Sequence, residues 1–207
     1  MHLRDTHSIP RLRAVLLDMD GTLTRPCLDF DGIRAEMQIT GPILEALRAM
    51  NEPRLSACKQ ILDRHESRAA VESELNDGCH DVLTWLRSHG IRTALITRNS
   101  ATSVRTVLAR HALDFEFILT RDFEPTKPHP APILRACEQL DVAPAEAWMV
   151  GDGCHDIEAG NAAGTPTVWI SHNESKPFEA KPWRTVPTLH DLLALLRSTI
   201  ERPVRRV

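Results

Sequence analysis

The chain has 207 residues, of which 42% are hydrophobic and 26% are charged, as expected for a globular protein with one core domain and a small appendage. Its 25 Lys and Arg residues nearly balance 28 Asp and Glu residues, and the formal net charge of −3 indicates no nucleic-acid partner. No apolar run approaches the roughly 18 residues of a membrane-spanning helix, so we expect no membrane association.

The N-terminal segment MHLRDTHSIPRLR is polar and lacks the apolar stretch of a secretory signal peptide. The five cysteines are widely spaced, odd in number and contain no Cys-x-x-Cys pair. We therefore expect reduced thiols in a cytoplasmic protein rather than a disulfide framework.

The first element is a short apolar strand, Ala14–Asp18, followed at once by Met19-Asp20-Gly21-Thr22. Two carboxylates at the end of a buried strand cost desolvation energy unless a metal ion or hydrogen-bond donors compensate them. Gly21 allows the backbone to turn tightly at this point. A turn of Asp and Gly is also common without any function, so the rest of the chain must decide between the two interpretations.

From Arg25 to Asn76 the chain holds no strand-like run, and apolar residues recur at helical spacing. Gly41 marks a break, and Pro42 is well placed to open a helix. The pattern predicts a small helical insert, residues 25–76, within a core formed by residues 1–24 and 77–207. Two apolar stripes carry this prediction: Ile43, Leu44, Leu47 and Met50, then Leu55, Cys58, Ile61, Leu62 and His65.

From about residue 80 onward, apolar strands alternate with helical patterns, which is typical of an α/β doubly wound sheet. Each strand-like run is continuous rather than alternating, as expected for parallel strands covered by helices on both faces. Ser100 and Thr188 are candidate helix N-caps, and the proline-rich segment Lys176–Pro187 is predicted to be a loop. The predicted strands are Arg92–Thr97, Phe115–Leu119, Trp148–Val150 and Thr167–Ile170.

Polar residues follow these strands where a parallel sheet gathers its ligands, at the carboxyl ends. Thr97 ends the second strand, Asp152 follows the fourth, and Lys127 precedes the fourth. Asp156 would share a face with Asp152 if a helix begins there. A hydroxyl, a lysine and several carboxylates at one edge are hard to attribute to chance.

In this order the motifs resemble those of the haloacid dehalogenase superfamily, in its phosphoglycolate-phosphatase-like branch. They are DxDGT at Asp18–Thr22, a hydroxyl residue at Thr97, a lysine at Lys127 and GDxxxD at Gly151–Asp156. The resemblance covers nearly the whole chain. It implies a Rossmann-like sheet of strand order 3-2-1-4-5 with a helical cap after the first strand, where the insert is expected. The insert is compact, whereas caps of this family are often somewhat larger.

The resemblance also implies a Mg²⁺-dependent phosphatase that hydrolyses a small phosphorylated metabolite, similar to phosphoglycolate or a sugar phosphate, through an aspartyl-phosphate. Asp18 would be the nucleophile. Asp20 would protonate the leaving oxygen and then activate the attacking water. The expected Mg²⁺ ligands are the Asp18 and Asp152 carboxylates and the Asp20 carbonyl oxygen, because Mg²⁺ offsets the repulsion between a carboxylate and a phosphate dianion.

The remaining roles are implied in the same way. Lys127 and the Thr97 hydroxyl would stabilise charge on the phosphoryl oxygens. Asp156 would support the metal through water or orient Lys127. Arg98 and Asn99 follow Thr97 directly and are candidates for contact with phosphate or substrate.

Weaker candidates lie around these motifs. The histidines His129 and His155 lie near motif residues, although packing or surface histidines are commoner than functional ones. Among the arginines of the insert one is a candidate substrate anchor, the others are expected on solvated helix faces, and the sequence does not single one out. These are Arg34, Arg48, Arg54, Arg64 and Arg68.

Two alternatives to a phosphatase stay open. A phosphomutase shares all four motifs, and phosphate release into water without a bisphosphate activator distinguishes the two activities. A binding or regulatory module, including a receiver-type signalling domain, would keep the fold without the hydrolysis, but all four motifs retain their reactive side chains. Asp20 argues against a dehalogenase, which lacks this second Asp, and against a P-type ATPase, which carries Thr there. The sequence leaves the ester and the oligomeric state open.

Overall fold

The computed structural model describes residues 11–175 and 179–200. Most of the polar N-terminal segment therefore lies outside the described residues, as does part of the predicted loop before the last helix. None of the helices in the described ranges is long and apolar enough to cross a membrane. All five cysteines lie in the described ranges, and all are free thiols.

Within the described residues, the core is a six-stranded sheet in the order β3-β2-β1-β4-β5-β6, in which every neighbouring pair is parallel. The expected order 3-2-1-4-5 is thus confirmed, and one more strand extends it. The strands are β1 Ala14–Leu17, β2 Arg92–Ile96, β3 Phe117–Leu119, β4 Ala147–Gly151, β5 Thr167–Ile170 and β6 Arg184–Val186.

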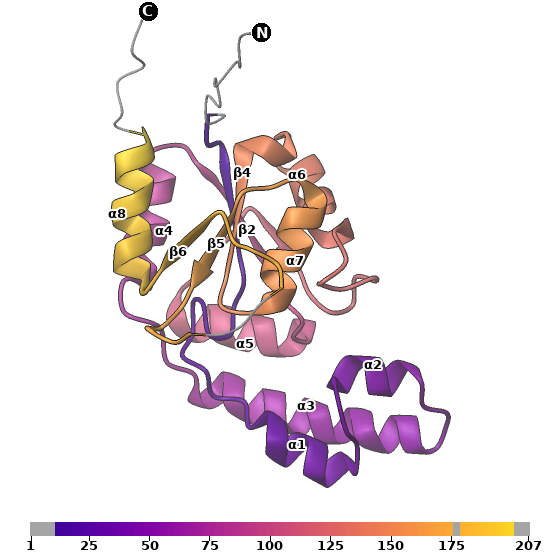
Figure 1. The fold of residues 1–207 in the computed structure, drawn as a ribbon. Helices are drawn as coiled ribbons and strands as arrows, with labels where there is room; N and C mark the ends of the chain where they lie inside the picture. The colour runs from indigo at the N-terminus through magenta and orange to yellow at the C-terminus, as the bar shows by residue number, and fades with distance from the viewer. Residues whose placement is uncertain (1–10, 176–178, 201–207) are drawn as a thin grey trace, which may run out of the picture.

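Helices cover both faces of this sheet (Figure 1). Helices α4, α5 and α8 contribute side chains to one core cluster together with Val15 and Leu17 of β1. Helices α6 and α7 contribute to the other cluster, together with Ala14 and Leu16. Successive β1 residues thus enter opposite clusters, and all four are fully buried. The helices are α4 Cys79–Ser88, α5 Ala101–His111, α6 Ala131–Gln139, α7 Cys154–Ala163 and α8 Leu189–Ile200.

The segment predicted as a loop before α8 contains β6, so this prediction was wrong for Arg184–Val186. The strand has three residues, lies at the sheet edge beside β5, and buries only Val186. Such a short edge strand has no apolar run to announce it among the prolines around it. The two predicted N-caps are confirmed, because the hydroxyls of Ser100 and Thr188 accept backbone N–H groups of the following helices at 3.3 and 3.2 Å.

The helical insert holds three helices that lie beyond one end of the sheet (Figure 1). They share a small hydrophobic cluster of their own, and Pro42 directly precedes the second helix as expected. Ala70, near the end of the third helix, joins the main core instead, so this helix ties the insert to the sheet unit. The helices are α1 Phe30–Met37, α2 Ile43–Arg48 and α3 Arg54–Glu72.

The central strand should dominate the stability of the fold. Leu16→Ala removes a fully buried side chain from β1, and we expect the free energy of unfolding to fall by about 2–5 kcal/mol. Leu134→Ala on α6 is the control, because Leu134 is 44% exposed and its loss should change stability by less than about 0.5 kcal/mol. Urea denaturation of both variants measures the difference. Equal losses would contradict this assignment of the core.

Candidate active site

The ends of the three central strands meet at one edge of the sheet. Leu17 of β1 is in register with both Leu95 of β2 and Val150 of β4. The residues that follow these strands therefore lie side by side, and the backbone N–H of Asp18 still donates to the Val150 carbonyl at 2.9 Å. All eight residues predicted for the site line one cavity of about 370 Å³: Asp18, Asp20, Thr97, Arg98, Asn99, Lys127, Asp152 and Asp156.

A second cavity of about 690 Å³ opens between α2, α3 and the start of α5, and it is the larger of the two. None of the eight predicted residues lines it. Size therefore does not identify the active site. The smaller cavity is the candidate active site, because the predicted residues line it.

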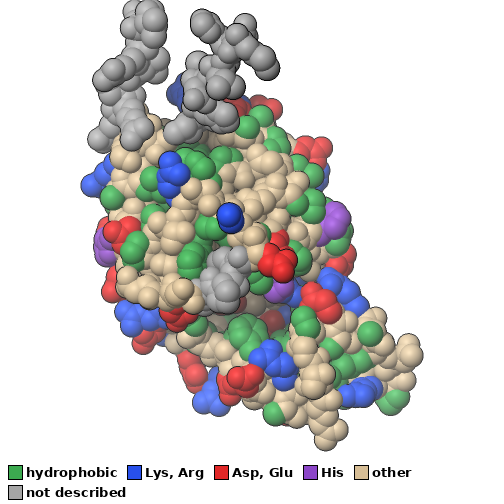
Figure 2. Space-filling view, viewed as in Figure 1, with side chains coloured by type: hydrophobic (Ala, Val, Ile, Leu, Met, Phe, Trp, Pro, Cys, Tyr) green, Lys and Arg blue, Asp and Glu red, His purple; other side chains and the backbone are tan. Residues whose placement is uncertain are grey.

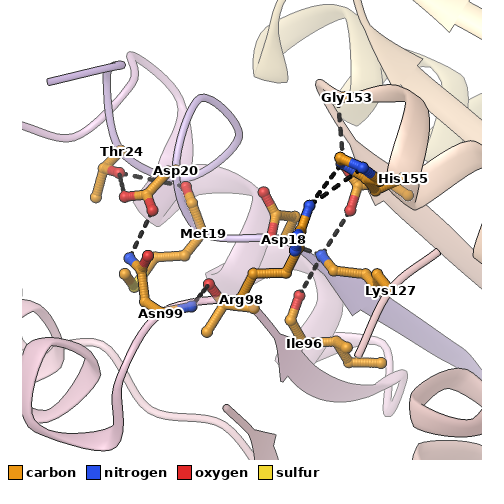
Figure 3. A network of polar contacts seen from close by, with 12 residues as sticks. Asp18, Met19, Asp20, Thr24, Ile96, Arg98, Asn99, Lys127, Gly153 and His155 are labelled. Carbon is orange, nitrogen blue, oxygen red and sulfur yellow. Dashed lines mark hydrogen bonds and ion pairs between the residues drawn. The ribbon is translucent and has the colours of Figure 1, made fainter. Parts of the chain in front are cut away.

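Lys127 is buried at the floor of the smaller cavity (Figure 3). Its ammonium donates to Asp18 Oδ1 at 2.7 Å, to Asp156 Oδ1 at 2.5 Å and to the Ile96 carbonyl at 2.6 Å. Three acceptors match the three N–H donors of an ammonium group. Burial disfavours the charged form, but the Asp156 and Asp18 carboxylates outweigh burial and raise the pKa of Lys127. Lys127 is therefore a fixed cation in this site.

Asp18 lies close to two other carboxylates, those of Asp152 and Asp156. Burial raises the pKa of Asp18 well above its ordinary value; Lys127 lowers it, while Asp156 and Asp152 raise it further. Carboxylate oxygens of Asp18, Asp152 and Asp156 lie within 4.8 Å of one another. A set of oxygen ligands at this spacing fits a hard divalent cation, which would offset their mutual repulsion.

Asp156 is held from two sides. Its Oδ1 accepts from Lys127, and its Oδ2 accepts from the backbone N–H of Gly153 at 3.1 Å. Of the two roles expected for Asp156, orientation of Lys127 has a direct bond in the structure.

Asp20 points to a different set of partners (Figure 3). Its Oδ2 accepts from the Asn99 side-chain amide at 2.5 Å, and its Oδ1 accepts from the Thr24 hydroxyl at 3.4 Å. Burial raises the pKa of Asp20, and the two hydrogen bonds lower it. A carboxyl group with a raised pKa that lines the cavity can hold and release a proton.

The three residues after β2 diverge. The Thr97 hydroxyl accepts from the Asn99 backbone N–H at 3.2 Å. Arg98 turns toward the insert and binds both carboxylate oxygens of Glu45 on α2, at 2.9 and 3.1 Å. It also contacts the His155 ring at 2.9 Å, and burial followed by the Arg98 charge lowers the pKa of His155.

Two residues that sequence reasoning missed hold the loop after Asp18. The Asn76 amide donates to the carbonyls of Gly21, Thr22 and Thr24 at 3.1, 2.8 and 3.1 Å. His172 Nε2 lies 2.6 Å from the Gly21 carbonyl. Neither residue belongs to a motif, so no pattern in the sequence indicated them.

Gly21 has a φ of +76°, and a Cβ there would come within 2.3 Å of the Asp152 carboxylate. This position therefore favours glycine, as expected from the tight turn after Asp20.

Ion pairs join the insert to the sheet unit beside the larger cavity. Arg48 binds Glu124 at 2.7 Å and the Thr126 hydroxyl at 2.9 Å. Arg121 binds Asp63 at 2.6 Å and also the buried Glu66 of α3. In Figure 2, acidic and basic side chains are interspersed where the lobe of the insert meets the rest of the molecule.

Comparison with known proteins agrees with the motifs. The model of the haloacid dehalogenase-like hydrolase family matches residues 37–170. The hydrolase YOR131C of Saccharomyces cerevisiae is 31% identical over 180 residues, 83% of each chain. The N-acetylmuramic acid 6-phosphate phosphatase of Pseudomonas aeruginosa is 30% identical over 81% of this chain and 85% of its own. The structure of a hydrolase from Pseudomonas syringae shares the fold, with a TM-score of 0.75 at 18% identity over 90% of this chain and 98% of its own.

The floor of the cavity generates a prediction about pH. Lys127→Met leaves buried carboxylates unpaired, and we expect the free energy of unfolding to fall by about 3–5 kcal/mol at neutral pH. Burial raises the pKa of Asp18 in the folded state, so acid protonates this carboxyl there and relieves its repulsion with the neighbouring carboxylates. The loss should therefore shrink as the pH falls.

Urea denaturation at pH 7 and pH 5 in chelator measures this trend. Lys59→Met, at an exposed position on α3, serves as the control and should change stability little at either pH. A loss that grows toward acid pH would contradict the charge balance described for Lys127.

Proposed function

Because the chain belongs to the haloacid dehalogenase-like hydrolase family, in its phosphatase-like branch, we propose that it is a Mg²⁺-dependent phosphatase of small phosphorylated metabolites. One observation carries this proposal: Asp18 directly follows the central strand β1, accepts a hydrogen bond from Lys127, and lies within 4.8 Å of two further carboxylates. A relative named for N-acetylmuramic acid 6-phosphate supports a small phosphorylated substrate.

Asp18 is the proposed nucleophile. Its carboxylate attacks phosphorus, the bond to the leaving oxygen breaks, and the phosphoryl group becomes attached to Asp18. Lys127 is placed to bind the phosphoryl oxygens and to orient the attacking carboxylate. We propose that Asp18, Asp152 and the Asp20 carbonyl hold Mg²⁺, with Asp156 as a support. Bound Mg²⁺ would neutralise charge on the phosphoryl group.

Asp20 is the proposed acid and base. It donates a proton to the leaving oxygen, and it then takes a proton from the water that attacks the aspartyl-phosphate. Asn99 and Thr24 fix the carboxyl group from both sides, which supports one orientation for both steps. We assign Asn99 to positioning Asp20 rather than to contact with phosphate.

We propose that residues 25–76 form a cap that selects the substrate, on a core of residues 1–24 and 77–207. Its links to the core begin beside Asp20, where Thr24 pairs with Leu75 in an isolated antiparallel bridge. The Arg98–Glu45 pair then connects the cap to the loop that carries Thr97. Closure of such a cap would exclude water while the aspartyl-phosphate forms.

A phosphomutase is the second candidate, since it would use the same four motifs. The two activities differ in the fate of the phosphoryl group, which returns to a sugar in a mutase and is released to water in a phosphatase.

We also propose a cytoplasmic location, supported by the five free thiols.

The metal requirement is the first test of the proposal. Inorganic phosphate should be released from 4-nitrophenyl phosphate when Mg²⁺ is present, without a bisphosphate activator, and release should stop in excess chelator. Colorimetric phosphate assays with and without the metal measure this. Undiminished turnover in chelator would overturn the metal assignment, and a strict need for a bisphosphate would favour the phosphomutase.

The role of Asp20 can be tested through the leaving group. Asp20→Asn should lower kcat at least about a hundredfold for an alkyl phosphate, whose leaving oxygen needs a proton. Formation of the aspartyl-phosphate from 4-nitrophenyl phosphate needs little proton donation, so it should be impaired less. Steady-state and rapid-quench kinetics separate the two. If Asp20→Asn slowed formation of the aspartyl-phosphate equally for the alkyl phosphate and for 4-nitrophenyl phosphate, the assignment of Asp20 as the acid would be contradicted.

A further inference from the structure

The cavity has two chemically different walls. Its floor is acidic, with Asp18, Asp20, Asp152 and Asp156 around a single lysine. The opposite wall comes from the insert and is largely apolar. Six of its side chains carry the argument: Leu28, Phe30, Arg34, Ile43, Leu44 and Leu62.

Phe30 and Arg34 lie four residues apart on α1, so they project from the same face of that helix. Both line the cavity. Phe30 is 50% exposed, although a large aromatic side chain is normally buried. An exposed aromatic ring at the wall of a polar cavity is accounted for if it packs against a ligand.

Arg34 is the cationic side chain on this wall, and its ion pair within the protein is weak. The cavity-lining Arg98 is paired with both oxygens of Glu45, and the cavity-lining Glu66 is paired with Arg121. Arg34 instead binds Asp31 at 2.5 Å, and the Asp31 side chain is 94% exposed. An ion pair so open to water contributes little, so Arg34 can exchange it for a ligand at small cost.

The other five arginines of the insert have partners elsewhere, and none of them lines this cavity. Arg25 binds Asp77 at 3.3 Å. Arg48 binds Glu124, and Arg54 donates to the carbonyls that end α1. Arg64 binds Glu36, and Arg68 binds Glu72. The sequence did not indicate which of these arginines anchors a substrate. In the structure, Arg34 is the one that lines the cavity.

We infer that the substrate is a phosphate monoester whose leaving group carries a carboxylate, bound by Arg34, and an apolar portion, packed on Phe30 and the neighbouring aliphatic side chains. This inference rests on the proposed function and specifies its substrate class. The acidic floor repels a second anion, whereas Arg34 attracts it to the opposite wall. A cavity of about 370 Å³ is near the lower end for ligand sites, so the leaving group is small.

The test compares 2-, 3- and 4-carboxyphenyl phosphate with the corresponding carbamoylphenyl phosphates, in which a neutral amide replaces the carboxylate. For at least one ring position the wild-type enzyme should prefer the acid to the amide by roughly tenfold or more in kcat/KM, as expected for a charge-assisted hydrogen bond. Arg34→Gln should bring that ratio close to one, and Arg34→Lys should restore part of it. Phe30→Ala should lower kcat/KM for acid and amide alike.

Arg68→Gln is the matched control, because it removes an arginine of the same insert that lies away from the cavity, and its ratio should equal that of the wild type. Equal rates for acid and amide in the wild-type enzyme at all three positions would overturn the inference, as would an Arg34→Gln variant that keeps the preference. Either result leaves the phosphatase activity standing. Failure to release phosphate from every aryl phosphate, 4-nitrophenyl phosphate included, would overturn the proposed function and this inference with it.

Discussion

The burial of a lysine among carboxylates constrains the whole site. A buried ammonium ion is costly unless each donor finds an acceptor, and Lys127 satisfies this with Asp18, Asp156 and the Ile96 carbonyl. These acceptors come from the end of β1, the end of β2 and the first turn of α7. The network therefore requires the strand order and register observed, and it draws separate parts of the chain to one edge of the sheet.

The same edge explains why the helical insert begins where it does. The chain leaves β1, passes Asp18 and Asp20, and enters the insert within a few residues. Asn76 lies where the chain returns from the insert to the sheet unit. Its side-chain amide donates to three carbonyls of the loop after Asp18, through which the chain enters the insert. Any movement of the insert is thus coupled to the loop that carries both aspartates. The Arg98–Glu45 pair provides a second coupling, to the loop after β2.

Much of this arrangement was predictable from the sequence, and the exceptions have physical reasons. Continuous apolar runs predicted the inner strands, because burial on both faces requires such runs. β6 lies at an edge and buries one residue, so it left no comparable signal. The gathering of the eight predicted residues in one cavity was predictable because they belong to ordered motifs at the ends of strands or in the loops that connect them. The contacts of Asn76 were not predictable, and Arg34 could not be singled out among the five candidate arginines, because tertiary structure alone decides which carbonyls or which cavity a side chain reaches.

The central claim is that Asp18 receives the phosphoryl group, and mass spectrometry of rapidly acid-quenched enzyme tests it most directly. After mixing with 4-nitrophenyl phosphate and Mg²⁺, peptide mapping should place a phosphoryl adduct on Asp18, and Asp18→Asn should show none. An adduct on another residue would contradict the account. So would direct attack of water on the ester, which inverts the configuration at phosphorus, whereas two successive displacements retain it.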